Sequence, residues 1–572
     1  MRTLKPYIRN YIKQCILSPL FKLLEACFEL IVPLVVKGII DVGIPNKDSS
    51  YIICSVVVLC IFALAGICFA ITAQYFASYA AAGITADLRA DLFNKVTRLQ
   101  EKDYDRLGAS SLITSLTSDV NQIASGINMV LRLLLRSPLI VIGATIMAFT
   151  VSVKLALIFI IVDLILFTVV YLNMKRSVPS FRKTREGLDE MVDETSNGIS
   201  GVRVIRGFNR THDIEQGFVA KSAELNSDQK KAAAISAILS PLTYLVINLA
   251  VCLLIGLGTL DFKTGALTAG AVTALYNYMS QILVELIKGA NVIVLLNKAT
   301  ACLERVRKIL DINTEGKIDS VELPNRDCPH EIRFDDVTFS YPGSSEPAVE
   351  NISFEISPSS SLGIIGMTGS GKSTIAKLMA GLYQPDSGSV TIDGLDINTI
   401  DRDCLSEELA MSLQKTSMFT ASIRDNITLS RPGIKDGDIT EACVISVTDE
   451  IAEGREDGLD CMIHASGTDL SGGQKQRIGI ARTLAGKPGV VILDDSTSAL
   501  DSITEKKVIN NILDMEDRPT LILISQKIRT VKRCDKILFI EDGKALFCLP
   551  HDKLYEISDS YRRLCSLQRE AV

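Results

Sequence analysis

Long apolar runs fill the first half of the chain, whereas short runs separated by polar turns fill the second. Six apolar stretches lie near residues 14–40, 51–80, 123–150, 153–174, 232–259 and 264–295. Each is long enough for the roughly 20 helical residues that cross a hydrocarbon core of about 30 Å. None alternates with the period of a strand, and an open sheet edge cannot face lipid. The pattern predicts an all-helical, six-span membrane domain over residues 1–312.

Basic residues predict the orientation of these spans. They precede the first span and follow the second and the fourth span. These residues are Arg2, Lys5, Arg9, Lys13, Arg89, Lys95, Arg98, Lys102, Lys175, Arg176, Arg182, Lys183 and Arg185. The loops after the first, third and fifth spans are short or mildly acidic. Because basic residues stay on the cytoplasmic side, we expect a multi-pass protein with both termini in the cytoplasm.

Composition agrees with a membrane protein and argues against one class of partner. Hydrophobic residues make up 47% of the 572 residues, which is high for a soluble chain. The net charge of −6 gives no support for nucleic-acid binding. We therefore expect a lipid bilayer as a partner and no nucleic acid.

The second half predicts a nucleotide-binding cassette. Residues 313–330 are rich in charge and turn formers and are assigned to a linker. The alternating run Glu331–Tyr341 and the apolar run Leu362–Ile365 are predicted strands. The second run leads into Gly366-Met-Thr-Gly-Ser-Gly-Lys372-Ser373, which fits the phosphate-binding loop G-x-x-x-x-G-K-[ST]. The pattern predicts an α/β P-loop NTPase domain over residues 331–572.

The chemistry of this loop follows from its residue types. Glycines let backbone N–H groups turn toward phosphate oxygens, and the helix that follows adds the positive end of its dipole. Lys372 is expected to reach the β- and γ-phosphates, and Ser373 to bind Mg²⁺. A later apolar strand, Val490–Leu493, ends in Asp494 and Asp495, and Asp494 is expected to hold Mg²⁺ through water.

A further motif, Leu470-Ser471-Gly472-Gly473-Gln474, lies between the phosphate loop and that strand. The order of these motifs, after six spans, resembles a half-transporter of the exporter type of ABC (ATP-binding cassette) transporter. The resemblance implies ATP and Mg²⁺ as ligands and an α-helical subdomain that carries the signature motif. It also implies that Ser471 to Gln474 face a nucleotide held by a second half-transporter.

The resemblance assigns further residues. About 40 residues separate the second and third spans and nearly 60 separate the fourth and fifth. It places short coupling helices in these connections, near 107–119 and 198–209. It places Tyr341 against adenine, and Ser373, Gln414 and Asp494 at Mg²⁺. The full set of expected nucleotide-binding residues is Tyr341, Gly366, Gly369, Ser370, Gly371, Lys372, Ser373, Thr374, Gln414, Asp494, Ser471, Gly472, Gly473 and Gln474.

Two residues depart from the family pattern. Asp495 stands where the family places a glutamate, the general base, and Gln526 stands where it places a histidine. Asp495 keeps the charge but withdraws it by one methylene, roughly 1–1.5 Å. Gln526 can donate a hydrogen bond but never a cationic one. We therefore expect a site that binds ATP well and hydrolyses it slowly, paired with a non-identical half that keeps the glutamate and the histidine.

The resulting functional hypothesis is ATP-driven export of amphipathic drugs, lipids or peptides by one half of a heterodimeric exporter. Two alternatives remain open, a homodimeric exporter with low ATPase activity and a regulatory or gating protein that uses nucleotide binding without transport. The compact layout, without a targeting extension, favours a bacterial cell membrane.

Charged residues inside the spans have two readings. Glu25 and Glu29 lie four residues apart in the first span, Arg132 and Arg136 likewise in the third, and Asp163 lies in the fourth. An unpaired charge at mid-bilayer is costly, so these groups face a cavity or a partner. They form either a polar lining that selects substrate or structural ion pairs.

Overall fold

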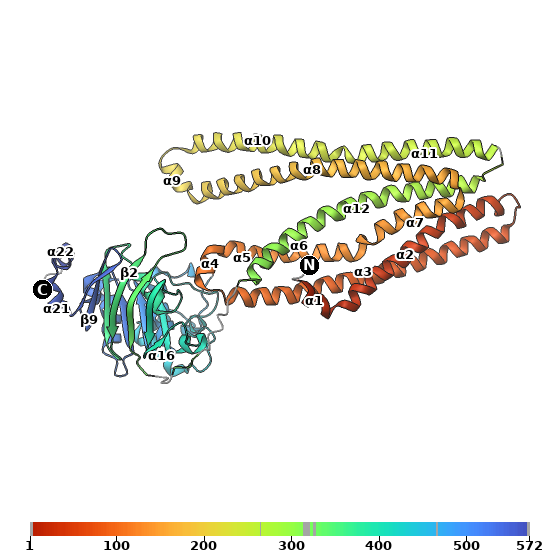
Figure 1. Cartoon of the computed structure of the whole chain (residues 1–572). Helices are drawn as coiled ribbons and strands as arrows, with labels where there is room; N and C mark the ends of the chain where they lie inside the picture. The colour runs from red at the N-terminus through yellow and green to blue at the C-terminus, as the bar shows by residue number, and fades with distance from the viewer. Residues whose placement is uncertain (1–3, 264, 313–320, 324–327, 465–466, 569–572) are drawn as a thin grey trace. The chain divides into compact units, whose positions relative to one another are not determined.

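The computed structural model describes residues 4–263, 265–312, 321–323, 328–464 and 467–568 (Figure 1). The chain divides into two compact units, each described by itself. The helical unit comprises Met1–Thr97 and Ala109–Ile312, and the α/β unit comprises Arg98–Gly108 and Asn313–Val572. Most of the expected linker 313–330 lies outside the described residues.

Helices and turns make up the described part of the helical unit. The helices, where η marks π-helical turns, are α1 (Lys5–Asn10), α2 (Ile12–Gly38), η2 (Ile39–Gly43), α3 (Ser49–Thr97), α5 (Ala109–Thr114), η3 (Ser115–Asp119), α6 (Val120–Met129), η4 (Val130–Leu134), α7 (Arg136–Val151), α8 (Val153–Ser200), α9 (Val202–Gly207), α10 (Thr211–Ala237), α11 (Leu239–Lys263) and α12 (Ala269–Leu310). The expected all-helical fold is confirmed.

Five helical segments of the described chain are long and apolar enough to span a membrane. They are Ser49–Thr97, Ala109–Val151, Val153–Ser200, Thr211–Lys263 and Ala269–Leu310. The first expected span coincides with α2, which has 27 residues but contains Lys22, Glu25 and Glu29. These charges keep α2 outside the set that composition alone identifies. Its apolar partners, and not its own hydropathy, place it in the bundle.

The long polar connections extend the spans as continuous helices. Helices α3 and α8 have 49 and 48 residues, so each is about 70 Å long at 1.5 Å per residue. Figure 1 shows α8 running beside α10 and α11. The short helix α9 falls within the expected range 198–209.

The first connection differs from expectation. Its separate short helix is α4 (Glu101–Leu107), which belongs to the α/β unit, and Gly108 follows it in the left-handed region at φ 75°. Of the expected coupling-helix range 107–119, residues 109–119 form α5 and η3 at the start of the third span. The expected range therefore begins at the last residue of α4. A positive φ that glycine alone adopts readily ends α4, and the polarity pattern does not reveal it.

The core of the helical unit joins α2, α7, α8, α11 and α12. Its fully buried side chains include Phe159, Tyr278, Ile140 and Leu254. The Tyr278 hydroxyl donates a hydrogen bond of 2.8 Å to the Leu30 carbonyl. This bond satisfies the polar end of a buried aromatic ring and joins the last helix of the bundle to α2.

Two sheets form the centre of the α/β unit. The strands are β1 (Ile332–Phe339), β2 (Val349–Ile356), β3 (Ser361–Gly366), β4 (Ser387–Ile392), β5 (Leu395–Asp396), β6 (Leu409–Ser412), β7 (Val490–Asp494), β8 (Thr520–Ile524), β9 (Lys536–Glu541) and β10 (Lys544–Leu549). Strands β2-β1-β4-β5 form an antiparallel sheet, and β10-β9-β3-β8-β7-β6 form a second sheet that is parallel except at β10. The central parallel strands are continuous apolar runs because both of their faces are covered.

The helices of this unit begin on signals that the sequence carries. They are α4, α13 (Lys372–Met379), α14 (Arg402–Glu408), α15 (Ile423–Thr428), α16 (Asp436–Ile445), α17 (Asp449–Glu453), the 3₁₀ turn η5 (Gly458–Asp460), α18 (Gly472–Leu484), α19 (Ser502–Leu513), α20 (Ile528–Val531), α21 (His551–Ile557) and α22 (Asp559–Leu567). Asp501 and Ser471 cap α19 and α18 through their side chains. The α/β fold with an inserted helical region, α15 to α18, is confirmed.

Candidate functional site

The phosphate loop joins β3 to α13 and is shaped by close backbone contacts. At Gly371 the backbone adopts φ 99°, and a Cβ there would lie 2.7 Å from the Ala348 carbonyl oxygen. At Gly366 a Cβ would lie 2.2 Å from the Ile540 carbonyl oxygen. Only glycine fits these two positions, which fixes the loop at the carboxyl end of the central strand β3. In parallel sheets this edge is where ligands bind.

Lys372 begins α13 and is nearly enclosed, with 8% of its surface exposed. Its Nζ donates to the carbonyls of Gly366 at 2.9 Å and Met367 at 2.7 Å. Burial lowers the pKa of this ammonium, while the carboxylates of Asp495 and Asp494 oppose the shift. The loop therefore holds a cation at the N-terminal end of a helix, where an anion is also favoured.

Ser373 and Asp494 form the expected oxygen pair. The Ser373 hydroxyl donates to Asp494 Oδ1 at 3.0 Å, so the last residue of β7 lies beside the phosphate loop. Asp494 is only 4% exposed, and this burial raises the pKa of its carboxyl. A hydroxyl and a carboxylate at this spacing are hard oxygen donors of the kind that Mg²⁺ prefers.

Asp495 follows in an unusual backbone conformation. Its φ of 49° lies in the left-handed region, and its N–H donates to the Ile524 carbonyl at 2.9 Å. The carboxylate Oδ2 accepts a hydrogen bond of 3.2 Å from Gln414 Nε2. Burial raises the pKa of the Asp495 carboxyl, and the bond from Gln414 opposes this shift. The backbone thus fixes the position from which the Asp495 side chain, one methylene shorter than a glutamate, extends.

Gln526 lies on the loop after β8 and is exposed. Its Oε1 accepts a hydrogen bond from the Thr368 hydroxyl at 3.4 Å, and its carbonyl accepts one from Gln568 Nε2 at 2.7 Å. The second bond ties this loop to the end of α22. Gln526 therefore reaches the phosphate loop through an uncharged amide.

Tyr341 follows β1 at the rim of the site. Its hydroxyl lies 3.3 Å from the Thr374 hydroxyl, and its ring packs edge-on against Tyr383 with centroids 5.5 Å apart. Lys377 Nζ lies 5.6 Å from the centroid of the Tyr341 ring. These contacts fix a flat aromatic surface beside the phosphate loop.

One cavity of about 410 Å³ brings most of the expected residues together. It is lined by Tyr341, Gly369, Gly371, Lys372, Ser373, Thr374, Gln414, Asp494, Asp495 and Gln526. Ala348, Thr368, Ile524 and Ser525 complete the lining and were not anticipated. Thr368 occupies a variable position of the motif, and the other three belong to segments whose approach only the fold determines.

The remaining expected residues lie outside this lining. Gly366 ends β3 below the loop, and Ser370 Oγ is buried without a hydrogen-bond partner among the described residues. The signature residues begin α18, where Ser471 Oγ accepts from the Gln474 N–H at 3.2 Å and Gln474 Oε1 accepts from the Ser471 N–H at 2.9 Å. This capping box fixes the exposed start of α18. The structure therefore separates the signature from the phosphate site of the same chain.

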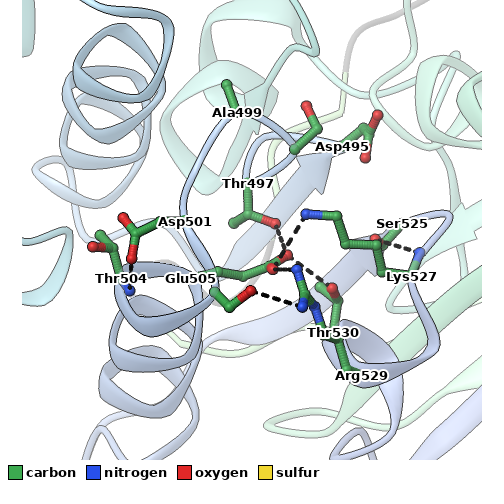
Figure 2. A network of polar contacts seen from close by, with 12 residues as sticks. Asp495, Thr497, Ala499, Asp501, Thr504, Glu505, Ser525, Lys527, Arg529 and Thr530 are labelled. Atoms are coloured by element: carbon green, nitrogen blue, oxygen red, sulfur yellow. Dashed lines mark hydrogen bonds and ion pairs between the residues drawn. The ribbon is translucent and has the colours of Figure 1, made fainter. Parts of the chain in front are cut away.

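Sequence reasoning missed a buried carboxylate that joins two loops of the site. Glu505 on α19 is 3% exposed and accepts hydrogen bonds from Thr497 at 3.0 Å and Thr530 at 2.9 Å. It also pairs with Lys527 at 3.3 Å and Arg529 at 2.9 Å (Figure 2). Thr497 follows Asp495, and Lys527 follows Gln526. Glu505 therefore fixes the loop of one altered residue to the loop of the other, a contact that sequence spacing does not reveal.

Gln476 makes a second connection, from the signature helix to the loop after β7. Its Nε2 donates to Ser498 Oγ at 3.0 Å, and its Oε1 accepts from the Ala499 N–H at 2.8 Å. Gln476 is 6% exposed, so these bonds form away from competing water. Gln476 thus connects the signature helix α18 to the loop after β7.

The charged residues expected inside the spans fall into two groups. Arg136 pairs with Glu25 at 3.4 Å and with Glu29 at 2.6 Å, so two of the expected residues meet a third. Arg132 lies 3.5 Å from Asn128 Oδ1, and Asp163 Oδ2 accepts from the Thr145 hydroxyl at 2.9 Å. The structure brings together α2 and α7 and leaves Arg132 and Asp163 in separate local contacts.

The chemistry of the cavity fits magnesium and a nucleoside triphosphate. The lysine on the glycine-rich loop suits phosphate oxygens, and Ser370 Oγ on the same loop, outside the lining, is buried without a hydrogen-bond partner among the described residues. Ser373, Asp494 and Gln414 offer the oxygen donors for the metal ion, and Tyr341 offers an aromatic face. These side chains come from four separate segments of the α/β unit.

Comparison with known proteins finds two family matches. Residues 15–286 match the family described as ABC transporter transmembrane region, and residues 349–498 match the family described as ABC transporter. The uncharacterized ABC transporter ATP-binding protein YfiB of Bacillus subtilis (strain 168) is 29% identical over 563 residues, covering 98% of this chain and 97% of that protein. The ATP-dependent lipid A-core flippase of Thiobacillus denitrificans is 28% identical over 569 residues, with 98% and 97% covered.

A solved structure shares the fold. The structure of a bacterial Atm1-family ABC exporter with ATP bound superposes with a TM-score of 0.82 at 20% identity, covering 98% of both chains. The likeness extends over both units.

Proposed function

Because this chain belongs to the ABC transporter family, as an exporter-type half-transporter that joins a membrane domain to an ATPase domain, we propose that it is the slow-site half of a heterodimeric exporter. Its own phosphate site binds Mg²⁺ and ATP and hydrolyses ATP slowly. Its signature residues complete a faster site on the partner. The pair moves amphipathic substrates across a cell membrane.

The observation that carries this proposal is the pair of altered residues on one cavity. Asp495 and Gln526 line it together with the phosphate-loop residues Lys372 and Ser373. A general base must lie within about 2.6–3.2 Å of the attacking water. The aspartate begins from a fixed backbone and is one methylene short, and the amide carries no charge. Both alterations weaken the same step and leave the phosphate-binding groups in place.

The residues of the site have separate tasks in this proposal. Bound ATP with Mg²⁺ supplies the phosphoanhydride bond whose hydrolysis powers transport. Lys372 and the loop N–H groups bind the phosphates, and Ser373, Asp494 and Gln414 hold the metal. Tyr341 offers its aromatic ring to the adenine of ATP. Asp495 is the acceptor for the proton of water, from a retracted position.

The need for a second chain follows from the signature. Ser471 to Gln474 form the exposed start of α18 and do not line the cavity of their own chain. They support a composite site in which each half supplies one face. One intact signature and one altered phosphate site are what an asymmetric pair requires from its slow half.

The name of one relative supports a class of substrate, and the basic loops of the membrane domain support an orientation in the membrane. The lipid A-core flippase of Thiobacillus denitrificans is named for a lipid, which supports an amphipathic substrate for this chain. The basic loops support cytoplasmic termini and a cytoplasmic ATPase domain.

ATPase measurements on the purified full chain test this proposal. We expect the chain alone to bind ATP in the presence of Mg²⁺ and to release phosphate at about one hundredth of the rate of the pair with its partner. Lys372→Ala should abolish binding and serves as the control. Brisk hydrolysis and transport by the chain alone would establish a symmetric homodimer and contradict the proposal.

A further inference from the structure

The helical unit contains a network of six ionisable side chains whose charges cancel. Three are cations and three are anions, and they connect helices that lie far apart in sequence. The members are Lys22, Glu25 and Glu29 on α2, Arg136 on α7, and Glu285 and Lys288 on α12. Such a balanced network can persist in a membrane domain because no member keeps an uncompensated charge.

The centre of the network is structural. Arg136 is 9% exposed and pairs with Glu25, Glu29 and Glu285, the last at 3.7 Å. Glu285 is 2% exposed and also accepts a hydrogen bond of 3.1 Å from the Ser137 hydroxyl. These groups hold α2, α7 and α12 together. Arg136 and Glu285 are too enclosed to bind a large ligand themselves.

Two members at the edge of the network remain open. The side chain of Glu29 is 41% exposed and that of Lys288 is 42% exposed. Both line a cavity of about 380 Å³ between α2 and α12. The cavity therefore presents one carboxylate and one ammonium, and each of them is already oriented by a partner behind it.

Uncharged groups complete the lining of this cavity. The polar ones are Asn277, Ser280 and Gln281, and the apolar ones are Val32, Pro33 and Val284. Gln281 Nε2 donates to the Glu29 carbonyl at 3.4 Å, but its Oε1 is buried without a hydrogen-bond partner among the described residues. A buried acceptor without a donor is unfavourable, and a ligand with a donor group would satisfy it.

The two exposed charges also indicate what surrounds the face of α2 and α12 that carries the cavity. A half-exposed carboxylate and ammonium toward lipid tails would be costly, so this face of α2 and α12 cannot be a lipid face. By contrast, the exposed side chains of α3 include Ile53, Leu64, Ile67 and Ile71, which suit lipid. The cavity thus faces a hydrated path or the second half of the transporter.

We propose that this cavity binds the head of the exported amphiphile, and that this head carries both a cationic and an anionic group. The inference rests on the proposed export function and specifies its substrate class. Glu29 receives the cationic group, Lys288 the anionic group, and Gln281 a hydrogen-bond donor. A head with one charge would leave a neutral network unbalanced, whereas a zwitterionic head keeps the balance.

A binding experiment on the full chain tests the charge preference. The chain contains no tryptophan, so Tyr276→Trp gives a single fluorescent reporter one turn before Ser280 on α12. The protein is kept without nucleotide in dodecyl maltoside, an uncharged detergent. It is titrated with dodecylphosphocholine, dodecyltrimethylammonium and dodecyl phosphate, which share one alkyl chain. We expect the zwitterionic probe to bind at least about tenfold more tightly than the purely cationic or the purely anionic probe.

Two charge-removing variants assign the two ends of the head. Glu29→Gln should weaken dodecylphosphocholine and dodecyltrimethylammonium about tenfold and leave dodecyl phosphate unchanged. Lys288→Gln should weaken dodecylphosphocholine and dodecyl phosphate by a similar factor and leave the cation unchanged. Both variants should fold, because Arg136 keeps Glu25 and Glu285, and Glu285 keeps Ser137. Unchanged thermal unfolding checks this point.

The matched control is Lys154→Gln, which breaks the ion pair of 2.7 Å with Asp261. It removes one paired charge outside the cavity and should change no affinity. Equal binding of the three probes, or variants that behave like this control, would overturn the inference. If the pair moves an amphiphile with ATP but shows no zwitterion preference, only the inference fails. If the preference holds and no substrate moves, the export proposal fails.

Discussion

At the scale of single residues, the proposed slow site departs from the family pattern at two side chains, Asp495 and Gln526. Asp495 is positioned by its left-handed backbone and by the hydrogen bond from its N–H to the Ile524 carbonyl. Its backbone therefore cannot shift toward the cavity to make up for a side chain that is one methylene shorter than a glutamate. Gln526 is held through its carbonyl by Gln568. In the proposal, the two alterations therefore change side-chain length and charge and leave the supporting backbone in place.

We predict that restoring both side chains restores hydrolysis. Asp495→Glu combined with Gln526→His should raise the ATPase rate of the isolated chain about a hundredfold, because the base regains its reach and the loop regains a cationic donor. Phosphate release measures this rate. The same double variant with Lys372→Ala should stay inactive. A double variant as slow as the parent chain would show that the slow step lies elsewhere.

A second residue-scale prediction concerns Asp494. Burial raises its pKa, so the folded chain holds this proton more tightly than the unfolded chain does. The free energy of unfolding therefore falls as the pH rises from the ordinary carboxyl pKa through the raised one, and it stays lower above that interval. Asp494→Asn removes this loss and should raise the melting temperature at neutral pH without nucleotide or Mg²⁺.

The stability gained by Asp494→Asn should shrink as the pH is lowered toward the ordinary carboxyl range, where the wild-type group is protonated as well. Thermal unfolding across pH measures the difference between the two proteins. The exposed Asp457→Asn is the control and should show no such trend. A gain that grows on acidification would refute the assigned direction. ATP binding should weaken in Asp494→Asn, because the site loses a carboxylate for Mg²⁺.

At the scale of elements, α19 supports the two loops that carry Asp495 and Gln526. Its Glu505 lies between the loop after β7 and the loop after β8, as Figure 2 shows. Four donors, two of them cationic, meet one buried carboxylate. A buried ion network of this kind is strongly destabilised when one partner is removed.

We predict a graded loss of stability at this position. Glu505→Ala should lower the free energy of unfolding by about 3–5 kcal/mol, because two cations and two hydroxyls lose their acceptor. Glu505→Gln keeps the shape and should cost about 1.5–3 kcal/mol. Glu350→Gln, which breaks the exposed pair with Lys544, is the control and should cost under about 1 kcal/mol. Equal effects of Glu505→Gln and Glu350→Gln in chemical unfolding would contradict the assigned role.

At the scale of the whole molecule, the two chains of the proposed heterodimer contribute differently to ATP hydrolysis. Lys372 belongs to the slow site, whereas Ser471 belongs to the site of the partner. The same polypeptide should therefore respond very differently to changes at these two positions. Such asymmetry separates a heterodimer from a homodimer, in which both changes affect every site.

We predict that Ser471→Ala lowers the ATPase rate of the reconstituted pair by about a hundredfold or more, the usual loss when one aligned hydrogen-bond donor is removed from a reacting phosphate. Lys372→Ala should lower it by only about twofold. Ser422→Ala is a matched control, because Ser422 caps α15 by the same kind of bond, 2.9 Å from the Asp425 N–H. The rate of steady-state phosphate release by the reconstituted pair measures these losses. Equal losses at Lys372 and Ser471 would support two equivalent sites.

The sequence by itself determined the parts that depend on local pattern. Apolar length predicted helical spans, and the glycines, Lys372 and Ser373 predicted a phosphate loop between a strand and a helix. Motif order predicted the family. These features succeed because a span, a turn or a cap depends on residues that are near one another in the chain.

Only the tertiary structure decided which distant groups meet. Hydrophobic periodicity gives the face of a helix that is buried but not its neighbour, so it could not place Arg136 against Glu29, 107 residues away. The same limit hid Glu505, whose partner Thr530 lies 25 residues further on, and the membership of α4 in the α/β unit. Charge pairing across helices is chosen by packing, because only the assembled fold removes these groups from water together.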